Sequence, residues 1–62
     1  MKITVKRLRA LDCNGGIVTQ GGFVDCEDIK NRIIERGLGE KGTFGVQEET
    51  KNGWFTIGMF TI

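Results

Sequence analysis

The sequence predicts an α+β fold in which one helix packs on one face of an antiparallel sheet, in the order strand, strand, helix, strand, strand. Two observations favour this class. Residues 43–62 contain two runs rich in β-branched and aromatic residues on either side of Asn52-Gly53, which is typical of a β-hairpin. Residues 25–37 have the capping residues and apolar spacing of a short helix. We expect one small domain over residues 1–62, with a correspondingly small core.

Asn52-Gly53 is the strongest local signal, because both residues of a two-residue hairpin turn must tolerate positive φ. A turn at these residues places Lys51 opposite Trp54 and Gly45 opposite Phe60. One sheet face then carries Phe44, Val46, Phe55, Ile57 and Met59, and the other carries Trp54, Phe60 and Ile62. Because a single helix covers only one face, the face with Trp54 is expected to be free and is the first candidate for binding.

The predicted helix runs from about Cys26 to Arg36, with Asp25 as its N-cap and Gly37 as the residue that ends it. An i,i+4 pair of Asp28 with Arg32 is expected on its outer side. Its apolar stripe, which is expected to dock on the sheet, consists of Cys26, Ile29, Ile33 and Ile34.

The N-terminal part predicts a second hairpin. Residues 2–11 alternate at first, with Ile3 and Val5 on the inner side. The alternation slips at Lys6-Arg7, where a β-bulge would restore Leu8 to the inner face. Residues 17–20 are expected to pair back on this strand and to end or bend at Gly21-Gly22. How the two hairpins join is left open.

Composition excludes most catalytic and metal chemistry. The chain has 9 Lys and Arg, 8 Asp and Glu, a net charge of +1, no histidine and two cysteines, so it lacks the commonest general base and the ligands of a zinc site. We expect no enzyme, cofactor or metal. Cys13 and Cys26 are expected to be reduced, although a bond between them stays open. Without a membrane-length apolar run or a signal-peptide core, we expect no membrane partner and a cytoplasmic location.

A basic cluster lies near the start of the chain and consists of Lys2, Lys6, Arg7 and Arg9. These cations could contact phosphates and give weak, salt-sensitive binding to nucleic acid. Alternatively, they protect an edge strand from pairing with other chains. For the aromatic face, one alternative is that the N-terminal segment folds over it. Another is that Phe60 covers the opposite glycine while Lys51 lies over Trp54 as a cation–π pair.

The layout resembles a group of very small phage and mobile-element proteins, including anti-CRISPR proteins, which bind a host complex and block it. The resemblance lies in the 62-residue frame from Met1, the single helix DCEDIKNRIIERG and the final hairpin TFGVQEETKNGWFTIG. It implies stoichiometric binding in the host cytoplasm rather than turnover. No residue roles follow from it.

Together these observations predict a non-catalytic binding protein whose partner is a protein or ribonucleoprotein complex, as an inhibitor or regulator. The expected partner-binding residues are Trp54, Phe60, Ile62, Lys51, Arg7 and Arg9. One alternative is a nucleic-acid-binding module that uses Lys2, Lys6, Arg7, Arg9 and Trp54. A second alternative is a structural homodimer closed through strand edges.

Overall fold

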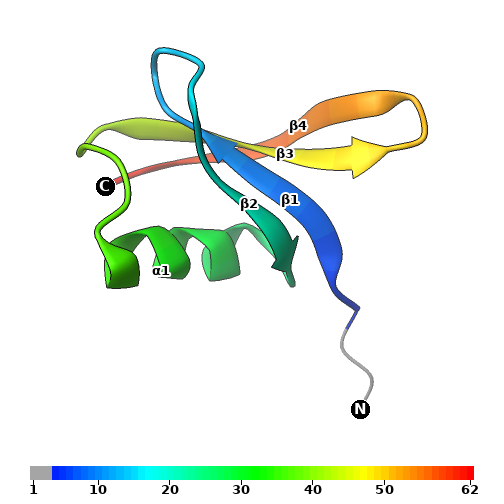
Figure 1. Ribbon diagram of the computed structural model, residues 1–62, viewed down its shortest axis with the longest axis horizontal. Coiled ribbons are helices and arrows are strands. Elements are labelled where there is room, and N and C mark those ends of the chain that lie inside the picture. The colour runs from blue at the N-terminus through cyan, green and yellow to red at the C-terminus, as the bar shows by residue number, and fades with distance from the viewer. Residues whose placement is uncertain (1–3) are drawn as a thin grey trace.

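A computed structural model describes residues 4–62 and shows, within them, a four-stranded antiparallel sheet and one helix (Figure 1). The elements are β1 (Lys6–Leu11), β2 (Ile17–Phe23), α1 (Cys26–Arg36), β3 (Thr43–Thr50) and β4 (Gly53–Thr61). The strand order in the sheet is β2-β1-β3-β4. The α+β class and the order of the elements are therefore confirmed.

The two hairpins join through β1 and β3, which pair antiparallel. Strand β1 is consequently a central strand with β2 on its other side, and β2 and β4 are the edges of the sheet. This arrangement overturns the interpretation that the cations of β1 protect an edge. Their presence needs a different explanation.

The N-terminal hairpin differs from expectation in its details. Leu8 and Ala10 are fully buried in unbroken alternation, so a bulge at Lys6-Arg7 is not needed. Its register shift instead lies between Ala10 and Leu11. Val5, expected inside, is 62% exposed, and Ile3 lies outside the described residues. Strand β2 continues through its two glycines to Phe23, so of the two alternatives, an end or a bend at Gly21-Gly22, the end is wrong.

Helix α1 has the predicted bounds and caps. The Asp25 carboxylate accepts the Asp28 N–H at 2.9 Å, and Gly37 ends the helix with a φ of 62°. The expected Asp28–Arg32 pair is not formed, because Asp28 Oδ2 accepts the Val24 N–H at 2.9 Å instead. The Arg32 guanidinium lies over the ring of Phe23, 5.6 Å from its centroid.

The core lies between α1 and one face of the sheet. Its buried residues are Leu8, Ala10, Phe23, Ile29, Ile33, Phe44 and Val46. Cys26 is partly buried against Gly58, where an added Cβ would lie only 2.9 Å from its sulfur. Glycine at this position therefore lets the helix approach β4. Ile34 is exposed, so the predicted apolar stripe was too wide by one residue.

The register of the C-terminal hairpin differs from the predicted one. Gly53 pairs with Thr50, and Trp54 lies opposite Glu49 rather than Lys51. Only Gly53 takes a positive φ, 115°, whereas Asn52 does not. The turn residues are thus Lys51 and Asn52, followed by a glycine in the manner of a three-residue hairpin loop. The Thr50 hydroxyl supports this turn, because it donates to the Gly53 carbonyl and accepts the Asn52 N–H.

The pairing of β3 with β4 shifts by one residue between Val46 and Gln47, which leaves Ile57 as an extra residue on β4. Beyond it, Phe60 pairs with Phe44, and their rings stack with centroids 5.4 Å apart. Phe60 and Ile62 pack against the core on the helix side. Their predicted place on the uncovered face is wrong, because the extra residue Ile57 exchanges the faces of the part of β4 that follows it.

Candidate binding surface on the open sheet face

The sheet face that α1 does not cover, here called the open face, is built by the residues of β1, β3 and β4 that alternate with the buried ones. In cross-strand order, Arg9 lies beside Gln47 and Gln47 beside Thr56, while Glu49 lies beside Trp54. The open face is therefore centred on Arg7, Arg9, Gln47, Glu49, Trp54 and Thr56. Two of the three strands involved are central, so the backbone beneath these side chains is held on both sides.

Arg9 and Trp54 form the centre of the open face. The Arg9 guanidinium carbon lies 4.2 Å from the centroid of the Trp54 ring, which is a cation–π contact. Arg9 Nε also donates to Gln47 Oε1 at 2.8 Å, and Gln47 Nε2 donates to the Thr56 hydroxyl at 3.4 Å. These contacts link three strands and fix the orientation of the arginine. The cation on Trp54 is thus Arg9, and the predicted Lys51 contact is wrong.

Arg7 forms an ion pair with Glu49 next to this centre. Arg7 Nε lies 2.9 Å from Glu49 Oε1, and the two side chains are 67% and 41% exposed. Such an exposed pair stabilises a fold by at most about 1 kcal/mol, because water screens it. Both groups can therefore exchange this contact for one with a partner at little cost.

A shallow hollow of about 440 Å³ adjoins this centre along the open face. Gly45 leaves it open, because no heavy atom lies within 4 Å of where a Cβ would be. Met59, opposite Gly45, is one of its walls and is 69% exposed. The remaining lining residues are Leu11, Asp12, Cys13, Gly15, Thr43 and Thr56. The open face thus combines a charged aromatic part with an apolar depression.

The structure brings together three of the predicted site residues and separates the others. Arg7, Arg9 and Trp54 share the open face. Lys51 is exposed in the β3–β4 turn, and Lys6 pairs with Phe23, on the other side of β1 from its arginines. Phe60 and Ile62 belong to the covered face, and Lys2 lies outside the described residues. Sequence reasoning missed Gln47, Glu49 and Met59, whose places depend on the register.

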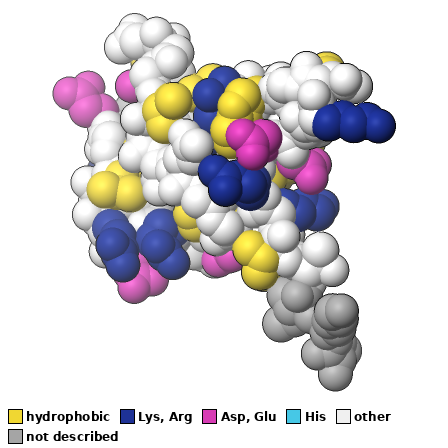
Figure 2. All heavy atoms as spheres, turned by 45° about the vertical axis from the view of Figure 1, so that its right-hand side comes forward, with side chains coloured by type: hydrophobic (Ala, Val, Ile, Leu, Met, Phe, Trp, Pro, Cys, Tyr) yellow, Lys and Arg dark blue, Asp and Glu magenta, His cyan; other side chains and the backbone are white. Residues whose placement is uncertain are grey.

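Charge is mixed on the side of the molecule that Figure 2 shows. On the side shown in Figure 2, hydrophobic side chains form small areas separated by basic and acidic ones, and the basic side chains do not merge into one continuous region. This distribution differs from the clustered basic face that is typical of nucleic-acid-binding domains.

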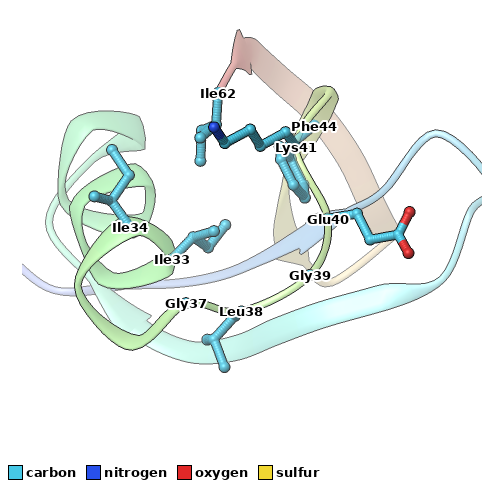
Figure 3. A pocket seen from close by; sticks show the side chains of 9 residues that line it. All are labelled: Ile33, Ile34, Gly37, Leu38, Gly39, Glu40, Lys41, Phe44 and Ile62. Carbon is cyan, nitrogen blue, oxygen red and sulfur yellow. The ribbon is translucent and has the colours of Figure 1, made fainter.

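A second hollow, of about 290 Å³, lies between the end of α1 and the end of β4 (Figure 3). Ile33 and Phe44 point into it from the helix and from β3, and the Lys41 side chain extends along its mouth toward Ile62. Both Ile33 and Phe44 are core residues. We interpret this hollow as the open end of the core.

Other kinds of site have little support in residues 4–62. Within this range, no cluster of three or more Cys, Asp and Glu side chains has the proximity needed to hold a metal ion. Cys13 and Cys26 are free thiols. The one helix of this range is neither long nor apolar enough to cross a membrane.

Comparison with known proteins does not assign the chain to a family. No protein-family model matches the sequence, and it has no significant match among curated proteins or solved structures. The function is therefore inferred from the geometry of the open face.

The contact between Arg9 and Trp54 can be measured by a double-mutant cycle. We expect Arg9→Ala and Trp54→Ala to be coupled by about 0.5–1 kcal/mol in urea unfolding, the size of an exposed cation–π contact. Arg32→Ala, which removes a cation from the ring of Phe23 on another part of the surface, provides the control and should be additive with Trp54→Ala. Additivity of the Arg9 and Trp54 variants would show that the two side chains do not interact.

Proposed function

We propose that this protein is a non-catalytic binding protein that docks on a protein or ribonucleoprotein complex through its open face and acts as a stoichiometric inhibitor or regulator of that complex. The observation that carries the proposal is the Arg9–Trp54 pair, held in one geometry by Gln47 on a sheet face that α1 leaves uncovered.

Residue type and preorganisation both support this use of the pair. Tryptophan and arginine are enriched among the residues that contribute most to binding at protein interfaces. Side chains that are already ordered lose less conformational entropy when a partner covers them. The exposed Met59 adds a flexible apolar side chain that adapts to a partner surface.

The size of the molecule is compatible with such an interface. A standard complex buries about 800 Å² on each partner. The surface of this protein is 4409 Å², so an interface of that kind covers about a fifth of it. One sheet face with its adjoining turns can supply this area.

The alternative of a nucleic-acid-binding module is weakened by the same contacts. Arg9 lies over the Trp54 ring, so a base would have to displace it in order to stack there. Arg7 is paired with Glu49, and Lys6 lies on the other side of β1. A protein partner can present both charges to this mixed arrangement. A polyanion that contacts Arg7 is repelled by the neighbouring Glu49 carboxylate.

The proposal predicts that Trp54→Ala abolishes capture of a partner. Tagged wild-type protein, Trp54→Ala and Ile34→Ala would be used in parallel to capture proteins from a lysate of the source cell. The loss of a central hot-spot residue costs about 2 kcal/mol or more, which weakens binding roughly 30-fold. Ile34 is an exposed apolar residue on α1, so its replacement should leave capture unchanged.

Circular dichroism melts of both variants would confirm that they are folded. Capture that survives Trp54→Ala, or that is lost with Ile34→Ala instead, would contradict docking through the open face. Single-stranded DNA of mixed sequence at physiological salt is expected to leave Trp54 fluorescence unchanged. Salt-sensitive quenching would favour the nucleic-acid-binding alternative.

A further inference from the structure

The outer edge of β4 lacks the usual protection of an edge strand. β4 ends the sheet, and no strand of the described residues 4–62 lies on its outer side. It is nine residues long, with the sequence GWFTIGMFT, and contains no charged residue and no proline. Natural edge strands are normally short, charged, interrupted by proline or covered, because an open edge pairs with other chains.

The backbone of β4 presents hydrogen-bonding groups along this edge. Gly42 and Ile62 exchange two backbone hydrogen bonds, of 3.0 and 2.9 Å. Hydrogen-bonded and non-hydrogen-bonded pairs alternate in an antiparallel ladder. Counting back from Ile62, Met59 and Thr61 occupy non-hydrogen-bonded pairs with β3. Their N–H and C=O groups therefore point away from β3, toward the free edge.

The side chains near the edge are apolar as well as exposed. Phe55, Ile57 and Met59 are 53%, 43% and 69% exposed. A strand added beside β4 would satisfy its backbone groups and cover part of this apolar surface at the same time. The new backbone hydrogen bonds and the burial of apolar surface both favour association at this edge.

The other edge of the sheet is less suited to pairing. Strand β2 has seven residues against nine for β4, and Ile17 is its one large exposed hydrophobic residue, whereas β4 has three. We therefore place the association at β4.

We propose that the occupant of this edge is a second copy of the chain, paired antiparallel with β4 about a two-fold axis to form one continuous sheet. A two-fold axis places the same strand on both sides, so residues near the axis face their own kind. Because β4 carries no charge, this pairing brings no like charges together. The proposal rests on the backbone edge of β4 and does not depend on the function proposed above, although the Met59 side chain adjoins both surfaces. Both open faces lie on the same side of such a dimer.

Sedimentation equilibrium over a concentration series tests the dimer with a matched pair of variants. Met59→Pro removes the N–H that points to the free edge and leaves the β3–β4 hydrogen bonds in place, whereas Met59→Ala removes the same side chain and keeps the N–H. Wild type and Met59→Ala are expected to reach twice the mass of the 6.9 kDa chain, and Met59→Pro is expected to remain a folded monomer. A dimeric Met59→Pro variant would overturn the proposal.

Hydrogen exchange of the wild-type protein gives a second test, which holds even if Met59→Pro does not fold. The amides of Met59 and Thr61 should exchange rapidly in dilute solution and become at least tenfold slower at concentrations where the mass doubles. If the wild-type protein is a monomer at every concentration, the proposal is wrong. An extended segment of another protein is then the candidate partner of this edge. A dimer that does not protect these two amides overturns the proposal as well.

Discussion

Replacing Phe44 with alanine is expected to remove a large part of the protein's stability. Phe44 is fully buried, stacks on Phe60 and lies between β3 and α1. Removal of a buried phenylalanine side chain costs about 3–5 kcal/mol, as lost transfer energy plus a cavity. At about 0.05–0.15 kcal/mol per residue, a domain of this length has a total stability of only about 3–9 kcal/mol. Urea unfolding followed by circular dichroism measures the loss.

Phe55→Ala is the matched control, because the same residue type lies in the same hairpin but is exposed. We expect it to cost less than about 1 kcal/mol, since little buried area is lost. Phe55 lies opposite Glu48, on the same sheet face as Phe44, but it is exposed there. Equal destabilisation by the two variants would therefore contradict the difference in burial between the two phenylalanines.

Gly53→Val is expected to destabilise the protein by about 1–3 kcal/mol, because a β-branched residue is strained at positive φ. Gly53 has a φ of 115° and follows the turn that joins β3 to β4. The strain falls on the hairpin that carries both Trp54 and the free edge. A lowered urea midpoint with an unchanged slope would report this effect.

Asn52→Ala separates the observed turn from a two-residue turn at Asn52-Gly53. Asn52 does not have a positive φ, so alanine is accommodated and the cost should stay near about 0.5 kcal/mol. In a type I′ turn, alanine at this position would be strained as well. A cost for Asn52→Ala comparable to that of Gly53→Val would mean that the turn lies one residue further along.

The helix was predictable because its signals are local. Asp25 at the N-cap and Gly37 at the end act within one turn of the helix, and both bounds agree with the structure. The exposure of Ile34 was not predictable, because it depends on how the helix crosses the sheet. Likewise, the central position of β1 follows from the contact between the two hairpins, which is remote in sequence.

The hairpin was predictable but its register was not. Asn52-Gly53 allows either a turn at these two residues or a turn at Lys51-Asn52 followed by glycine, and the Thr50 hydroxyl favours the second. The polar residues give no further signal, because Gln47 and Thr56 lie on the outer face in both registers. Phe60 lies inside only because Ile57 is an extra residue on β4.

For the candidate binding surface, the sequence predicted the types of residue better than the side chains that they contact. Arg7, Arg9 and Trp54 were all expected to contact a partner, with only Trp54 assigned to the uncovered face, and the three share the open face. Their contacts with Gln47 and Glu49 depend on the pairing of β1 with β3 and of β3 with β4, which no local pattern encodes. The anchors Phe60 and Ile62 were misplaced for the same reason.

Amide chemical-shift mapping of isotope-labelled protein with the captured partner is the most direct test of docking through the open face. We expect the largest changes at the Trp54 indole and at the amides of Arg7, Arg9 and Gln47, with the outer side of α1 unaffected. Changes centred on α1 or on the hollow between α1 and the end of β4, with Trp54 unmoved, would contradict the proposed docking surface.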